Sequence, residues 1–274
     1  MSSTPVAGTS RGDPRLSLAG RRRVRGVAGL VVGVGGFLLV WTLLSELIFG
    51  EFTLPPPLEI GQLMWEIVRS GEFIHHFAPT ILRLAYGFGL ALLIGFPVGY
   101  LMGTSRWWRA FFHDMVMVAG SIPGITYAVL ALVLFGISIL GPVLSVGLIS
   151  MPYVAINVAE GLDSVDRRLV QMSDAYGRRR PTIVRNVLIP SVAPFAFAGV
   201  RLSFALAWKV EQLTEVFGSS SGVGFQIRHE FEDFSIPGML AWVLLFIVFM
   251  ILLERFVLAK LERFLFRWRL EDRP

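Results

Sequence analysis

Residues 79–103 read PTILRLAYGFGLALLIGFPVGYLMG, a 25-residue run in which Arg83 is the single charged side chain. A helix rises 1.5 Å per residue, so about 20 mostly apolar residues cross a hydrocarbon core of about 30 Å. This run is therefore long enough to span a membrane. Similar runs cover residues 24–49, 111–137, 140–160, 190–217 and 237–258. The sequence predicts an all-α, multi-pass membrane protein with six transmembrane helices.

The composition supports this class and excludes others. Of the 274 residues, 54% are hydrophobic and 16% are charged, whereas soluble domains carry about 25% charged residues. Mean hydropathy is +0.65, which excludes a soluble globular enzyme and a disordered chain. The sequence contains no cysteine, so disulfides, thiolate metal sites and cysteine nucleophiles are excluded.

The distribution of basic residues predicts the topology. Four segments (11–25, 106–109, 167–185 and 255–273) hold 20 of the 25 Lys and Arg residues. With six spans all four lie on one side, whereas an odd number would mix them with the acidic segments. The positive-inside rule then places both termini in the cytoplasm. The net charge of +5 thus reflects cytoplasmic loops, and we expect the lipid bilayer and no nucleic acid as a partner.

This topology divides the chain into three parts. We expect a disordered basic cytoplasmic N-terminus over residues 1–23, a transmembrane domain over 24–268 and a cytoplasmic tail over 269–274. A secretory signal is the alternative for the start of the chain. The run from residue 24 is too long for one and lacks a clear cleavage site.

The longest cytoplasmic loop, residues 161–189, is followed by Pro190 and reads GLDSVDRRLVQMSDAYGRRRPTIVRNVLI. Apolar residues recur at helical spacing up to Tyr176, and Gly177 breaks the pattern. A second short helix is expected after Pro181, and Pro190 opens the next span. Two interpretations remain open: an interfacial hairpin on anionic lipid, or a docking element for a cytoplasmic partner.

The loop resembles the cytoplasmic signature of bacterial ABC-importer permeases, which reads Glu-Ala-Ala, three residues, Gly, nine residues, Ile-x-Leu-Pro. Gly177 and Pro190 stand thirteen residues apart, as that signature requires, with Val187 and Ile189 at its Ile and Leu places. The Glu-Ala-Ala positions differ and hold Gln171, Met172 and Ser173. Residues 54–57 (LPPP), 135–137 (FGI) and 218–224 (GSSSGVG) resemble the nitrate/sulfonate/taurine-type branch, so the similarity extends over about residues 54–268.

The resemblance implies a type I ABC-importer permease fold in the bacterial inner membrane and a set of partners. These are a cytoplasmic ABC ATPase dimer, a second permease subunit (an identical or a different chain) and an extracytoplasmic solute-binding protein. ATP and Mg would belong to the ATPase, with no cofactor in this chain. The implied cargo is a small polar or anionic solute of the sulfonate, nitrate or taurine class. The residues implied to form or flank the coupling helix are Asp174, Ala175, Tyr176, Gly177, Arg178, Arg179, Arg180 and Pro190.

The fifth span carries polar residues at helical spacing. Arg201, Trp208, Gln212 and Glu215 fall on one predicted helix face, with Lys209 and Glu211 beside it. Ionisable groups inside a span usually face the bundle interior or a water-filled cavity. These six residues, together with Asn157 in the fourth span, are therefore predicted to line the translocation pathway. Interhelical hydrogen bonding is the alternative.

Other functions lack the residues they need. No Gly-x4-Gly-Lys-Ser/Thr motif occurs, so we expect no ATP site and no catalytic residue in this chain. His75 and His76 are adjacent and do not share a helix face, so no metal site is expected. A stand-alone channel or secondary transporter is the main rival, although it would not need the arginine-rich loop. An intramembrane enzyme is less favoured because the four histidines supply no nucleophile–base pair.

Overall fold

The computed structural model describes residues 29, 31–50 and 52–265, and all regular secondary structure in these ranges is helical. The chain divides into two compact units, residues 1–60 and 61–274. The predicted N-terminal segment 1–23 and tail 269–274 lie outside the described residues.

The first unit contains the first predicted span. Its described part is the helix Val31–Phe49, with 19 residues, which ends in a π-helical turn, η1 (Ser45–Phe49). The chain then turns at Gly50 (φ 73°). Trp41 Nε1 donates to the carbonyl of Pro55 (3.1 Å) and Ser45 Oγ to that of Leu54 (2.5 Å). These bonds fasten the turn to the end of the helix.

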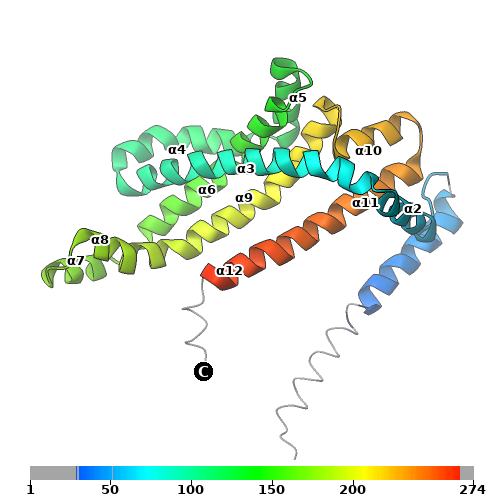
Figure 1. The fold of residues 1–274 in the computed structure, drawn as a ribbon. Helices are drawn as coiled ribbons and strands as arrows, with labels where there is room; N and C mark the ends of the chain where they lie inside the picture. The colour runs from blue at the N-terminus through cyan, green and yellow to red at the C-terminus, as the bar shows by residue number, and fades with distance from the viewer. Residues whose placement is uncertain (1–28, 30, 51, 266–274) are drawn as a thin grey trace, which may run out of the picture. The chain divides into compact units, whose positions relative to one another are not determined.

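The remaining helices are shown in Figure 1. In chain order they are α2 (Pro57–Ser70), α3 (Glu72–Thr104), α4 (Arg106–Ser121), α5 (Gly124–Phe135), α6 (Leu140–Asp163), α7 (Arg167–Ala175), α8 (Arg180–Ile183), η2 (Val184–Leu188), α9 (Ile189–Gly218), α10 (Val223–Glu232), α11 (Ile236–Leu253), η3 (Glu254–Leu258) and α12 (Ala259–Leu265). Five helical segments of the described chain are long and apolar enough to span a membrane, or six if α4 and α5 form one bent span. The prediction of six spans agrees with the second count.

The centre of the second unit is a close contact between α3 and α6. A Cβ placed on Gly99 would lie 2.5 Å from the backbone oxygen of Ala155, and one on Gly95 would lie 2.8 Å from Val154 Cβ. Small residues therefore bring the two backbones together, as in other membrane helix pairs. The small residues of α3 recur at every fourth position: Gly87, Ala91, Gly95, Gly99 and Gly103.

This contact also fixes the chain direction. Gly87 faces Val146, and Gly103 faces Leu162, so α3 and α6 run parallel. The chain must cross back between them, and α4 and α5 make that return. Tyr153 Oη lies 3.4 Å from the Gly120 carbonyl, and Arg109 pairs with Asp163 (2.5 Å), so α4 runs antiparallel to α6.

The predicted third span, 111–137, is bent, because α4 and α5 meet at an angle of 93°. The bend lies at Ile122 and Pro123, both extended, with ψ of 126° and 141°. Proline has no N–H to continue the ladder and disfavours helical geometry in the residue before it. After the bend, α5 packs beside the second half of α9, where a Cβ on Gly124 would meet Val210 and one on Gly218 would lie near Leu132.

The predicted second short helix of the cytoplasmic loop is also corrected. Residues Arg180–Gly218 form one continuous 39-residue helical segment, so α8 and η2 are the beginning of α9. The widened π-helical turn η2 ends two residues before Pro190, whose missing N–H removes a bond from the ladder. Figure 1 shows α7 and α8 at the opposite end of α9 from α10.

The α3–α6 contact predicts unequal effects of one extra methyl group. Gly99→Ala forces the two backbones apart and should cost about 1–3 kcal/mol of stability, as overpacking does. Gly89→Ala is the matched control on the same helix, because nothing lies within 4 Å of its added Cβ. Thermal unfolding in nanodiscs measures both variants. Equal melting temperatures for the two variants would contradict this packing.

Candidate functional site

Local hydrogen bonds and a left-handed glycine form α7 and the turn that follows it. Asp166 caps the start of α7 by accepting a hydrogen bond from Arg168 N (2.8 Å). At the other end Gly177 takes a left-handed conformation (φ 66°), and Arg178 N donates to the Ser173 carbonyl (3.1 Å). This six-to-one bond with a left-handed glycine is a Schellman helix end. The predicted helix and glycine turn are thus confirmed.

The α7 elbow, residues 167–180, has an unpartnered apolar face. No residue of α7 is buried, and Leu169, Met172 and Tyr176 are 44%, 53% and 78% exposed. They stand at i, i+3 and i+7, so they share a face. The other residues predicted for coupling here are exposed too: Asp174, Ala175, Gly177, Arg178, Arg179 and Arg180. Pro190 instead lies within the continuous helix that follows.

A buried polar network, the Glu215 clamp, forms at the far end of α9. The Glu215 carboxylate accepts hydrogen bonds from Thr80 Oγ1 (2.8 Å), Arg83 Nη1 (2.6 Å) and the backbone N–H of Gly224 (3.0 Å). Arg83 also donates to the carbonyl and hydroxyl oxygens of Ser221 (2.7 and 2.8 Å). The clamp therefore joins α3, α9, the 219–222 loop and α10.

Glycine is required where the loop closes over this carboxylate. Gly222 has φ 112°, and a Cβ there or on Gly224 would collide with the Glu215 side chain. The glycine-rich segment 218–224 is thus a cover for a buried carboxylate. Glu215 itself is 0% exposed, so it belongs to the protein interior. Its burial fits the alternative of interhelical hydrogen bonding, and a pathway role stays a prediction.

Three more predicted residues turn into the bundle. Glu211 is 0% exposed, and neither of its carboxyl oxygens has a hydrogen-bond partner in the described part of the chain. The same holds for the side-chain amide of Gln212 and for Trp208 Nε1. The Trp208 ring packs edge-on against Phe246, with centroids 5.7 Å apart. The predicted polar face of α9 is therefore not one continuous surface.

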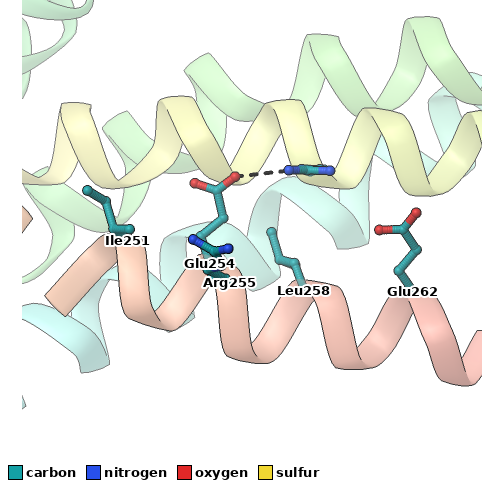
Figure 2. Close-up of a pocket in the computed structure, with 6 residues that line it drawn as sticks. Ile251, Glu254, Arg255, Leu258 and Glu262 are labelled. Atoms are coloured by element: carbon teal, nitrogen blue, oxygen red, sulfur yellow. Dashed lines mark ion pairs between the residues drawn. The ribbon is translucent and has the colours of Figure 1, made fainter. Parts of the chain in front are cut away.

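Arg201 and Lys209 point outward instead. The Arg201 side chain is 57% exposed, and its Nε lies 3.6 Å from Glu254 Oε1. A dashed line marks the ion pair of Glu254 in Figure 2. Lys209 is exposed, with Nζ 5.7 Å from the Trp208 ring centroid. Charges on a spanning helix avoid lipid and face protein or water. A pathway role for these two residues stays a prediction.

Asn157 lies where α6 meets α9. Its Nδ2 donates to the Tyr153 carbonyl in its own helix (2.8 Å). A Cβ on Gly199 would lie 2.7 Å from Asn157 Cβ, so the two helices touch at this point. The position fits the alternative of helix packing, and a lining role is again untested.

Sequence reasoning missed the partner of Glu215. In the sequence Arg83 stands out only as the single charge of its span, and nothing distinguishes Thr80. One signal could have found the pair, because a charge buried within a membrane span needs an opposite charge. No group of three or more His, Asp or Glu side chains that could hold a metal ion occurs within residues 29, 31–50 and 52–265.

The Glu215 clamp predicts non-additive effects of mutation. Arg83→Gln leaves Glu215 without its counter-charge and should cost about 3 kcal/mol of stability. Arg83→Gln/Glu215→Gln should cost less than the sum of the single changes, because the two groups interact directly. Thermal unfolding in nanodiscs measures each variant, with exposed Arg69→Gln as the control. Strictly additive effects would contradict a direct interaction.

Comparison with known proteins agrees with this architecture. The family model described as binding-protein-dependent transport system inner membrane component matches residues 91–263. The putative aliphatic sulfonates transport permease protein SsuC of Bacillus subtilis (strain 168) is 28% identical over 251 residues, covering 91% of this chain and 90% of that protein. The taurine transport system permease protein TauC of Escherichia coli (strain K12) is 25% identical over 246 residues, covering 87% and 89%.

A solved structure is similar in fold. The inward-facing MetNI methionine ABC transporter contains a chain that matches with a TM-score of 0.59 and 21% identity, covering 74% of this chain and 97% of that one. The family match extends over more than half of the sequence. The chain therefore belongs to the binding-protein-dependent transport system inner membrane component family and is an ABC-transporter permease.

Proposed function

We propose that this chain forms part of the pathway of an importer driven by a separate cytoplasmic ATPase dimer, which docks on the α7 elbow. A second permease subunit completes the pathway, and an extracytoplasmic binding protein delivers a small polar or anionic solute. The observation that carries this proposal is the exposed apolar face of α7 at the base of a helix that crosses the whole bundle.

The continuous helix connects the α7 elbow with the opposite end of the bundle. Its 39 residues span about 58 Å at 1.5 Å per residue. One end carries the α7 elbow and the other carries Glu215 of the clamp. ATP-driven closure of paired subunits is a rigid-body motion, and a rigid helix passes such a motion along its axis. Movement at the elbow is thereby transmitted to the loop that covers Glu215.

The charge distribution supports a cytoplasmic location of the α7 elbow. The two ends of the α7 elbow carry Arg167, Arg168 and the run Arg178–Arg180, which favours the cytoplasmic side of the inner membrane and both termini on that side. The exposed arginines would also attract acidic side chains around a docking groove on the ATPase. The chain has no P-loop motif, so ATP and Mg are held by the ATPase and this chain hydrolyses nothing.

The exposed cations support an anionic or polar cargo. The exposed side chains of Arg201 and Lys209 place positive charge on the surface of α9. The similar permeases of Bacillus subtilis and Escherichia coli are named for aliphatic sulfonates and taurine. Both observations favour a small solute that carries an oxyanion group.

The docking role predicts loss of the ATPase when the apolar face is removed. Met172→Ser with Tyr176→Ser should weaken co-purification with the ATPase about tenfold or more, as loss of buried interface anchors does. Phe231→Ser on α10 is the control, because Phe231 is similarly exposed (68%) but lies far from the elbow. Pull-down from nanodiscs measures retained ATPase, and ATP hydrolysis by the complex gives a second readout.

The rival interpretations give different results in this experiment. If the double variant retains the ATPase and its hydrolysis of ATP, the proposal fails. Unchanged transport by the variant in proteoliposomes would then favour a stand-alone channel or secondary transporter, whereas transport that depends on the fraction of phosphatidylglycerol in the bilayer would identify α7 as an interfacial hairpin.

A further inference from the structure

A polar hollow lies between α9 and the end of the last helix. It has a volume of about 320 Å³ and is lined by Arg201, Ile251, Glu254, Arg255, Leu258 and Glu262. We refer to these six residues as the Arg201 pocket. Pockets for small molecules have volumes of about 300–1,000 Å³, so the space suits a solute of a few heavy atoms.

Arg201 and Glu254, the charged partners in the pocket, lie at similar depths in the membrane. Arg201 stands 17 residues before the end of α9 at Gly218, which is about 26 Å along the axis. Glu254 stands 18 residues after Ile236, the start of α11, which is about 27 Å. For a hydrocarbon core of about 30 Å, both charges reach its cytoplasmic edge in the proposed orientation.

The arginines of the pocket carry more N–H donors than the contact between Arg201 and Glu254 engages. The Arg201 Nε–Glu254 Oε1 separation of 3.6 Å is too long for a hydrogen bond. A guanidinium carries five N–H donors, and the side chain is 57% exposed. Arg255 is also exposed. An oxyanion entering the pocket would therefore meet guanidinium groups that are only loosely engaged.

The acidic groups balance these cations. Glu254 and Glu262 are eight residues apart and point toward α9 from the same side of the last helix, with Leu258 between them (Figure 2). Two arginines and two glutamates give the lining no net formal charge. A solute that is itself dipolar complements such a lining at both ends, whereas a simple ion leaves one sign of charge unmatched.

The exposure of these charges excludes lipid tails as their neighbour. Arg201 and Glu254 are 57% and 31% exposed on spanning helices, and ion pairs exposed to hydrocarbon are costly. The open side of the pocket must therefore face water, lipid headgroups or another protein chain. In the proposed importer this is the pathway between two permease subunits.

We propose that the Arg201 pocket binds a small dipolar solute as it leaves toward the cytoplasm. The oxyanion of the solute lies on Arg201 and Arg255, and its ammonium or hydroxyl group donates to Glu262. This inference rests on the proposed importer function and identifies the class of its cargo as small molecules that carry both an oxyanion and a donor group.

Glu254 has a separate role in this site. Its loose pairing with Arg201 is displaced when the oxyanion binds and is restored when the solute leaves. The carboxylate therefore competes with the cargo and keeps the site weak enough to release it. Removing this competitor should tighten binding of the oxyanion group.

The test uses the complete complex in phosphatidylglycerol nanodiscs and two probes, 2-aminoethanesulfonate and ethanesulfonate. Saturation-transfer NMR gives their dissociation constants. We expect the amino-sulfonate to bind more tightly than ethanesulfonate. Arg201→Gln should weaken both about tenfold, Glu262→Gln should weaken only the amino-sulfonate, and Glu254→Gln should tighten ethanesulfonate. Arg69→Gln, an exposed arginine of α2, is the matched control.

Three outcomes overturn the proposal: no binding of either probe to the unmodified complex, binding unchanged within twofold by Arg201→Gln, or equal effects of Glu262→Gln on both probes. A lipid headgroup could supply the same dipolar chemistry. If phosphatidylethanolamine in the nanodisc abolishes probe binding, the pocket is a headgroup site and the proposal also fails.

ATPase retention and ATP hydrolysis are measured on the same samples. If these persist while probe binding does not depend on Arg201, the pocket is wrong and the importer function stands. If the ATPase does not assemble with the unmodified chain, the proposed function itself fails.

Discussion

The contact between α3 and α6 is the constraint on which the second unit depends. Two parallel helices touch backbone to backbone because α3 places a small residue at every fourth position of the interface. Lipid tails are as apolar as the helices, so close packing has to supply association that the hydrophobic effect supplies in water. The parallel arrangement obliges α4 and α5 to return the chain, and the bend at Pro123 lets that return also cover the second half of α9.

The long helix that begins at Arg180 connects the two ends of the bundle. At one end the α7 elbow exposes apolar side chains that nothing in the described chain covers. At the other end Glu215 is held by α3 and by backbone of the following loop. A helix anchored by buried charge at one end and exposed for docking at the other is suited to transmit movement.

The charged residues of the spans divide into two groups by burial. Glu215 and the largely buried Arg83 lie in the chain's own interior, where their ion pair and hydrogen bonds compensate for burial. Arg201 and Lys209 are exposed instead, with Glu254 partly exposed beside Arg201, as expected for a subunit that functions beside a second one. The buried charges of the spans therefore hold the helices of this chain together, and the exposed charges mark the surface that meets water or another subunit.

The sequence by itself determined the class of fold and the glycine turn at Gly177, because apolar run length and a left-handed glycine are local properties. Only the tertiary structure decided the fusion of α8 with α9 and the separation of Glu215 from Arg201. These depend on which neighbour fills the space around each residue. A helical pattern shows which residues share a face, but burial of that face depends on helices distant in sequence, as Arg83 and Glu215 demonstrate at a separation of 132 positions.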